Sequence, residues 1–235
     1  MEITKGVKIV DLALYLEKYR ILVIGDLHLG YEEALNKQGL LVPRFQYTEI
    51  IKRLEDIMKK VSPDTVVING DLKHEFGTIS DQEWRQALNL IDFFAGKKII
   101  IVKGNHDTII GPIADRKNVE VVKQFDIADE FTIVHGNFIP EKMNRTVIIG
   151  HEHPAVTFPD RPDEKYKCFL YGKYKRHKLV VMPSFNFVTA GTDVQREQLL
   201  SPFLHGQKLD GFDVFIVENS RAYRFGKLKN IRKMR

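Results

Sequence analysis

The chain has 235 residues, of which 43% are hydrophobic and 29% are charged, and its formal net charge at pH 7 is +5. This length and composition suit one globular domain over residues 1–235, and no apolar stretch is long enough to cross a membrane. The first residues are too polar for a secretory signal, and the single cysteine, Cys168, cannot form an internal disulfide, so we expect a cytoplasmic protein.

The first part of the chain alternates apolar runs with helical patterns. Residues 8–16 are predicted to form one strand, followed by a turn at Lys18-Tyr19 and a second strand over 20–24. A short helix is expected over residues 31–38, and a longer helix with one apolar face is expected to open at Pro43. The apolar face of the longer helix should pack on a sheet.

Two further strands, at residues 65–69 and 98–102, flank another predicted helix. Ser80 and Glu83 have the spacing of a capping box, which marks the start of that helix. The resulting β-α-β-α-β order predicts parallel strands that are joined by right-handed crossovers.

After residue 118 the helical periodicity almost disappears, and short β-rich runs take its place. These runs predict a second, mostly antiparallel sheet that packs against the first. They lie at residues 119–122, 131–134, 146–149, 167–171, 178–182, 212–217 and 221–225. Residues 183–187 and 190–193 resemble an ordered loop, which would lie at the rim of a site.

Five of the apolar runs end in short motifs that are rich in Asp, His and Asn. The ends of strands are where α/β proteins place ligands and chemistry, and these motifs hold six of the eight histidines. The motifs are Gly25-Asp-Leu-His28, Gly70-Asp-Leu-Lys-His74, Gly104-Asn-His-Asp107, Val134-His-Gly136 and Gly150-His-Glu-His153. The composition is that of a metal site.

Seven side chains in these motifs are candidate metal ligands: Asp26, His28, Asp71, Asn105, His135, His151 and His153. Carboxylate, imidazole and amide ligands without a thiolate favour Mn, Fe or Zn over a structural zinc cage. Seven ligands exceed the needs of one ion but suit two ions that share a carboxylate. Paired ions about 3.5–4 Å apart are a recurrent device for phosphoryl hydrolysis.

In this order, the five motifs resemble those of the calcineurin-like metallophosphoesterases. The motif core covers residues 20–154, and a mostly β second half with a basic end follows over 155–235. The resemblance implies an α/β fold, specifically a two-sheet α/β/β/α sandwich, with two divalent ions at the strand ends. Mn²⁺ would be the main choice, with Fe, Zn or Ni as alternatives.

The resemblance also implies which residues bind each ion. Asp26, His28, Asp71 and His153 would hold one ion, and Asp71, Asn105, His135 and His151 would hold the other, with Asp71 bridging the pair. His106 would be an acid that faces the phosphate without binding either ion.

His74 departs from the usual motif of the phosphatases in this family, which have Gly-Asp-x-x-Asp. Gly70 to His74, together with Asp26 to Glu32, looks like the SbcD-type DNA nucleases. The shortness of the chain makes it most similar to the short SbcD-related (ICC-like) archaeal phosphoesterases and the bacterial relatives associated with DNA ligase. The alternative for His74 is a solvated histidine in a turn.

The function that this resemblance implies is hydrolysis of phosphodiester bonds, in nucleic acid or nucleotides, by in-line attack of a metal-bound hydroxide. His106 would protonate the leaving oxygen or stabilise its charge, with His74 and Asp107 nearby. One alternative is a phosphomonoesterase that acts on a small metabolite or a protein. Another is a non-catalytic scaffold, although every ligand position is filled.

Two basic segments suit a polyanionic partner such as DNA or RNA. Residues 165–178 interleave lysines with tyrosines, and residues 221–235 hold seven Lys and Arg without an acid. The alternative for both is a solvated rim with a frayed tail. The oligomeric state stays open.

Overall fold

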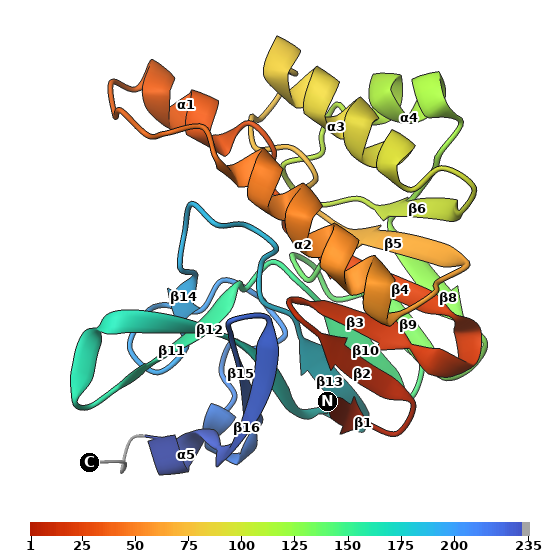
Figure 1. Cartoon of the computed structure of the whole chain (residues 1–235). Helices are drawn as coiled ribbons and strands as arrows, with labels where there is room; N and C mark the ends of the chain where they lie inside the picture. The colour runs from red at the N-terminus through yellow and green to blue at the C-terminus, as the bar shows by residue number, and fades with distance from the viewer. Residues whose placement is uncertain (232–235) are drawn as a thin grey trace.

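The computed structural model describes residues 1–231, and within them two β-sheets pack face to face (Figure 1). The first sheet has its strands in sequence order, antiparallel from β1 to β4 and parallel from β4 to β7. They are β1 (Glu2–Thr4), β2 (Val7–Val10), β3 (Ala13–Leu16), β4 (Ile21–Gly25), β5 (Thr65–Asn69), β6 (Lys98–Val102) and β7 (Glu120–Val122). The predicted parallel strands at 20–24, 65–69 and 98–102 are therefore confirmed.

The prediction of a single strand over residues 8–16 is wrong. The segment is the β2–β3 hairpin, in which Val10 pairs with Ala13 across a two-residue turn at Asp11 and Leu12. Asp11 has a positive φ of 56°, which suits a tight hairpin turn, but both turn residues are buried. The run therefore lacks the exposed polar residues that usually mark a turn in a sequence.

Four helices lie over the outer face of the first sheet (Figure 1). They are α1 (Tyr31–Lys37), α2 (Gln46–Lys60), α3 (Asp81–Phe93) and α4 (Gly111–Lys117). The predicted capping box of α3 is confirmed, because Ser80 Oγ accepts from the Glu83 N–H and Glu83 accepts from the Ser80 N–H. The sequence did not predict α4.

The start of α2 lies at Gln46 rather than at the predicted Pro43. The buried carboxylate of Glu32 accepts hydrogen bonds from the backbone N–H groups of Phe45 and Gln46, both at 2.7 Å. A helix leaves its first N–H groups without partners, so this carboxylate on α1 supplies the cap from elsewhere in the chain. A partner thirteen residues away leaves no local signal.

The second sheet is mixed and mostly antiparallel, as predicted, with parallel pairing of β10 to β9 and β13 and of β11 to β14. Its strands are β8 (Gln124–Ile127), β9 (Phe131–Val134), β10 (Thr146–Ile149), β11 (Pro154–Phe158), β12 (Arg161–Tyr174), β13 (His177–Val181), β14 (Thr192–Asp193), β15 (Asp213–Glu218) and β16 (Arg221–Lys227). Strands β8, β11 and β14 were not predicted, and β7 belongs to the first sheet rather than the second.

The predicted α/β/β/α order is confirmed, but its fourth layer is mostly irregular. The outer face of the second sheet is covered by the chain from residue 194 to the 3-10 helix Leu209–Gly211, and by the short helix α5 (Leu228–Ile231). Phe203 and Leu204 of this segment are fully buried against the sheet. No helix among residues 1–231 is long and apolar enough to cross a membrane. Arg232, Lys233 and Arg235 of the basic tail lie outside the described residues.

The parallel strands of both sheets bring their carboxyl ends to one side of the molecule. In the first sheet Gly25 pairs with Asn69, and Asn69 with Val102, so the motifs that follow β4, β5 and β6 start at one level. In the second sheet β9 and β10 run parallel. The backbone N–H of His151, after β10, donates to Asp26 Oδ2 at 3.0 Å, so the two sets of strand ends meet.

Candidate metal centre

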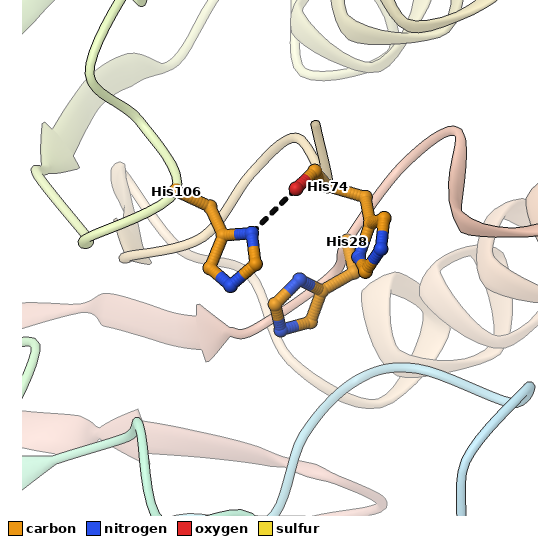
Figure 2. Close-up of side chains that lie close together, drawn as sticks. All are labelled: His28, His74 and His106. Carbon is orange, nitrogen blue, oxygen red and sulfur yellow. Dashed lines mark hydrogen bonds between the residues drawn. The ribbon is translucent and has the colours of Figure 1, made fainter. Parts of the chain in front are cut away.

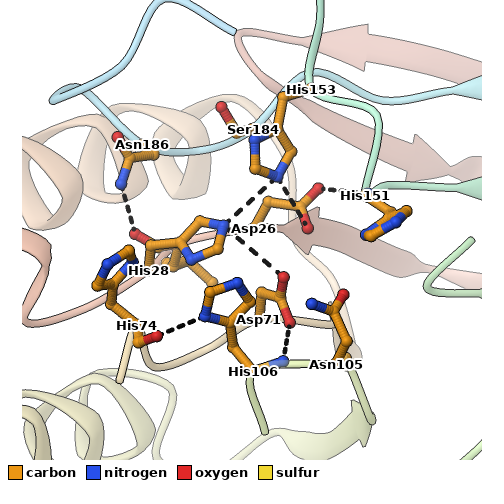
Figure 3. Close-up of polar contacts among 12 residues, drawn as sticks. Asp26, His28, Asp71, His74, Asn105, His106, His151, His153, Ser184 and Asn186 are labelled. Atoms are coloured by element: carbon orange, nitrogen blue, oxygen red, sulfur yellow. Dashed lines mark hydrogen bonds and ion pairs between the residues drawn. The ribbon is translucent and has the colours of Figure 1, made fainter. Parts of the chain in front are cut away.

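Asp26 and His28, after β4, face His153, after β10 (Figure 3). His153 Nε2 lies 3.4 Å from Asp26 Oδ1 and 3.4 Å from His28 Nε2. One ligand atom from each of these three residues lies within 4.8 Å of the other two. They form a first cluster that could hold a cation.

A second cluster joins Asp71, His135 and His151, with the same limit of 4.8 Å between ligand atoms. His135 Nε2 lies 3.4 Å from Asp71 Oδ2 and 3.0 Å from the side-chain oxygen of Asn105. Asn105 therefore borders this cluster, as the resemblance implied. All seven candidate ligands lie in or beside the two clusters.

Asp71 lies between the clusters. Its Oδ2 is 3.4 Å from His135 Nε2 on one side and 3.8 Å from His28 Nε2 on the other. Its Oδ1 accepts the backbone N–H of His106 at 2.9 Å. One carboxylate oxygen is thus used to hold the chain, and the other faces both clusters.

Most ligands of the clusters are buried, and several of their polar atoms make no hydrogen bond. Asp26 and His135 are fully buried and Asp71 is 2% exposed. Asp26 Oδ1, His28 Nδ1 and His135 Nδ1 make no hydrogen bond. Buried polar atoms without partners are rare and destabilising, so an unexplained group of them indicates an absent ligand. With these carboxylate and imidazole donors, the residues fit divalent metal ions.

The protonation states of His28 and His151 also suit metal binding. Burial and then the neighbouring His153 lower the pKa of His28 to about 3, and burial and then His135 lower the pKa of His151 to about 4. Neutral imidazoles keep the lone pair that a metal needs. Burial opposes the charge on Asp71, but the ion pair with His135 outweighs it and holds the pKa of Asp71 well below its usual range.

The backbone of the clusters is unusual. Five of the seven candidate ligands have a positive φ: Asp26 (54°), His28 (47°), Asp71 (44°), His151 (63°) and His153 (50°). This left-handed region is uncommon for residues with a side chain and costs of order 1–3 kcal/mol each. Such strained residues concentrate at functional sites, where the surrounding structure holds them.

Two glycines allow the carboxylates to lie where they do. A Cβ on Gly104 would approach Asp71 Oδ1 to 2.1 Å, and a Cβ on Gly150 would approach Asp26 Oδ2 to 2.4 Å. Each glycine belongs to one of the sequence motifs, so the motif supplies the space for a ligand from another strand end.

His74 and His106 lie next to His28 of the first cluster (Figure 2). His106 Nδ1 is hydrogen-bonded to the backbone carbonyl of His74. The ring of His106 packs on Phe76 with centroids 3.8 Å apart, and the ring of His74 stacks on Tyr31 at 3.9 Å. The backbone of His74 therefore holds His106, and the two rings also stack with their centroids 5.4 Å apart.

Comparison with known proteins decides the family. A model of the family described as calcineurin-like phosphoesterase matches residues 19–211. The chain belongs to this family. Its fold is similar to that of the nuclease MPE of Pseudomonas putida, with a TM-score of 0.67 and 17% sequence identity over 93% of this chain and 94% of that one.

A weaker likeness is to Yfce, a phosphoesterase from E. coli, with a TM-score of 0.41 and 15% identity over 85% of this chain and 88% of that one. No curated protein matches the chain at a significant level. The family match confirms the resemblance found in the motifs, and the protein is a metal-dependent phosphoesterase.

In this phosphoesterase, Asp107 supports the loops instead of facing the site. It is fully buried, and its carboxylate accepts the backbone N–H groups of Leu72 (3.1 Å), Lys73 (3.4 Å) and Gly104 (3.0 Å). Burial, and then the charge of Asp71, raise the pKa of Asp107 to about 6. The geometry favours a positioning role over the contact with the reaction that the motif suggested.

Glu152 is a functional residue that the sequence reasoning missed. It lies between two candidate ligands and is fully buried, and its Oε2 accepts the backbone N–H groups of Leu200 and Ser201, both at 2.8 Å. Ser201 Oγ in turn donates to the carbonyl of Gly136 at 2.7 Å. The irregular outer segment thus holds two ligand loops of the phosphoesterase together. Only the position of Glu152 within the His-Glu-His motif could have indicated this.

The predicted loop is confirmed for residues 183–187, whereas Thr192–Asp193 of its second stretch form strand β14. The backbone N–H of Phe185 donates to the carbonyl of Gly25 at 2.9 Å, and Asn186 Nδ2 donates to the carbonyl of Leu27 at 3.3 Å. The loop therefore packs on the strand end that carries Asp26 and His28, beside the metal centre (Figure 3).

The basic segment 165–178 does not form the continuous surface that its sequence suggested. Lys165 forms an ion pair with Glu197 at 2.5 Å, and Lys167 donates to Ser184 Oγ at 2.6 Å. Tyr171 bonds to Thr4, and Tyr174 packs in the core beside Phe203. The middle of strand β12 is buried on both faces, because Cys168, Phe169 and Leu170 are all fully buried, and this separates the basic residues before it from those after it. Exposed cations remain at Lys173, Lys175, Arg176 and Lys178.

Proposed function

We propose that the protein is a two-metal phosphodiesterase that acts on nucleic acid or nucleotides. The observation that carries the proposal is the position of Asp71, whose Oδ2 faces the imidazole nitrogens of both clusters at 3.4 Å and 3.8 Å. A carboxylate so placed suits two neighbouring ions better than one.

The geometry supports the ligand sets that the resemblance implied. One ion would be held by Asp26, His28, Asp71 and His153, and the other by Asp71, Asn105, His135 and His151. Ions bound there supply positive charge for the phosphate oxygens and acidify a water molecule. The mixed carboxylate and imidazole donors suit Mn²⁺, and also accept Fe, Zn or Ni.

His106 is the proposed proton donor to the leaving oxygen. Because the carbonyl of His74 accepts the proton on Nδ1, the other ring nitrogen, Nε2, is left for the substrate. The stacking of Phe76 against the ring limits its rotation. The chain itself therefore orients the donor nitrogen before a substrate binds.

Two features support a diester of a nucleotide. The stretch Gly70 to His74 resembles the SbcD-type nucleases, with His74 where phosphatases of the family carry Asp. Phe76 is 57% exposed beside His106 and offers a flat ring on which a base could stack. We therefore place the protein with the short SbcD-related phosphoesterases, and DNA or RNA among its proposed substrates.

The test is an activity screen after the protein is reconstituted with Mn²⁺. Bis(p-nitrophenyl) phosphate should be turned over faster than p-nitrophenyl phosphate, and single- or double-stranded oligonucleotides should be cleaved. Asp71→Asn serves as the matched inactive control. A faster reaction with the monoester, with intact oligonucleotides, would make the protein a phosphomonoesterase, and no turnover of any ester would contradict the catalytic role.

A further inference from the structure

A third group of possible metal ligands consists of imidazoles alone. His28, His74 and His106 each offer a ring nitrogen, and these nitrogens lie within 4.8 Å of one another. The ring centroids are 4.9 Å apart for His28 and His106, 5.5 Å for His28 and His74, and 5.4 Å for His74 and His106. Figure 2 shows the rings of the three residues gathered around one point.

We propose that His28, His74 and His106 form a further cation position that is selective for ions such as Zn²⁺. The two clusters of the metal centre each contain a carboxylate, whereas this group contains none. Imidazole ligands suit Zn, Cu and Ni, while carboxylates and water suit Mn and Mg. Three protein nitrogens with an open fourth position are a coordination that zinc commonly adopts.

The free nitrogen atoms of these rings support the site. His28 Nδ1 and His74 Nδ1 are buried and have no hydrogen-bond partner. His106 uses Nδ1 for the carbonyl of His74, which leaves Nε2 available as a ligand. The burial of unpartnered nitrogens next to one another is costly unless something binds them.

The distances require little movement. Zn–N bonds of about 2.0–2.1 Å in a tetrahedral site place the ligand nitrogens about 3.3–3.4 Å apart. The present upper limit of 4.8 Å can close to that value by small side-chain rotations. The stacking of His74 on Tyr31 and of His106 on Phe76 keeps both rings near the required positions.

His28 belongs to the three-histidine group and also to the first cluster with Asp26 and His153. An ion among the three histidines therefore competes for His28 with the ion of that cluster. It also occupies the ring nitrogen of His106 that the proposed reaction uses. Zinc should accordingly inhibit the manganese-loaded protein. This inhibition rests on the proposed function, whereas the proposal of the three-histidine site does not depend on it.

The experiment compares zinc and manganese binding in the wild type, His74→Ala and His74→Gln, by competition with a chromophoric chelator. His74 lies outside both clusters of the metal centre, so its loss should leave Mn²⁺ affinity unchanged. One zinc-binding step should weaken about 100-fold in both variants, because even the outer partners of a metal are worth about 10–100-fold in affinity. His205→Ala removes an exposed histidine elsewhere and is the control.

X-ray absorption of the zinc-loaded protein gives a second readout, since one imidazole should disappear from the zinc shell in His74→Gln. Zinc affinity and zinc coordination that are the same in the wild type and both variants would overturn the three-histidine site. Failure of Mn²⁺ to bind the wild type would instead contradict the two-metal centre of the proposed function. The circular dichroism spectrum of each variant shows whether it folds, and His74→Gln keeps the volume of the side chain if His74→Ala does not.

Discussion

The backbone N–H of His106 donates to Oδ1 of Asp71 at 2.9 Å. This bond fixes the carboxylate with its other oxygen toward the two clusters, and it ties the loop that carries the proposed proton donor to the proposed bridging ligand. A change in the position of Asp71 should therefore alter the binding of both proposed ions and the position of His106.

Asp71→Asn should cost more bound metal than any other single ligand change. It removes the charge next to both clusters, whereas His28→Ala removes one imidazole from the first cluster only. We expect less than one tightly bound ion per chain and about a 100-fold or greater loss of activity, since a ligand should matter at least as much as an outer partner. Elemental analysis with parallel rate measurements checks this. Retention of two ions at near-full rate would exclude the bridging role.

Gly104→Ala tests the position of the Asp71 carboxylate without changing Asp71 itself. The new Cβ would meet Asp71 Oδ1 at 2.1 Å and the Asp71 backbone nitrogen at 2.3 Å, so the carboxylate must move. We expect metal affinity to fall by about 10–100-fold, as for the loss of an outer partner. Gly111→Ala, with nothing within 4 Å of the new Cβ, is the matched control and should bind metal normally. Equal metal affinity in the two variants would contradict the close approach at Gly104.

His106→Ala should keep both metals and slow the reaction in a way that depends on the leaving group. General acid catalysis contributes about 10²–10⁴-fold, and it matters most for a poor leaving group such as a sugar hydroxyl. With p-nitrophenolate, which leaves without a proton, the loss should be much smaller. Rates against leaving-group pKa at equal metal content measure this, and equal losses for good and poor leaving groups would exclude proton donation.

His74→Ala should combine additively with His106→Ala in the same assay. If the ring of His74 oriented His106, the two losses would be non-additive. The bond runs instead from His106 Nδ1 to the backbone carbonyl of His74, and the alanine variant keeps that carbonyl. Clear non-additivity would show that the stacked ring of His74 also positions His106.

The metal-free protein should lose stability as the pH falls below 6.5. Burial, followed by repulsion from neighbouring imidazoles, lowers the pKa values of His28, His74 and His151 to about 3, 4 and 4. The unfolded chain takes up these protons near pH 6.5 and the folded chain does not, so unfolding is favoured by up to about 1.4 kcal/mol per pH unit for the buried His28 down to about pH 4. The contribution is smaller for the partly exposed His74 and His151, whose charged forms are screened by solvent.

His135 does not offset this loss. Burial opposes the charge on His135, but the bond to Asp71 and nearby carboxylates outweigh it and raise its pKa to about 9. The stability from His135 is therefore complete below pH 6.5 and is lost only as the pH rises toward 9. Urea unfolding of the chelator-treated protein at pH 7 and pH 5 measures the effect, and a stability that is equal at the two values would contradict it.

The site could be predicted much further than the fold around it. Each candidate ligand lies in a short motif after an apolar run, so local sequence singled out all seven candidates, and parallel pairing of the strands brings them together. Strands such as β11 and β14 were missed because their pairing partners, not their own patterns, define them. Local sequence therefore predicts candidate ligands at strand ends better than it predicts which strands pair.

The contacts that hold the site were hidden for a similar reason. Glu152 bonds to Leu200 and Ser201, and Glu32 caps a helix to which it does not belong. A buried carboxylate that accepts hydrogen bonds from the backbone of a distant segment cannot be told from an exposed carboxylate by the residues next to it in the sequence. Asp107 is a further example, since its carboxylate accepts three backbone N–H groups that its own motif does not indicate.

The left-handed backbone at five of the ligands has a consequence for how such a chain would change if selection for catalysis ended. Asp26, Asp71 and His153 hold conformations that glycine adopts more easily. Natural proteins often trade stability for a functional site, so a duplicated copy without a catalytic duty would gain stability from such replacements. Glycine at these positions in a descendant would therefore indicate that metal binding had been lost, even where the surrounding strands had changed little.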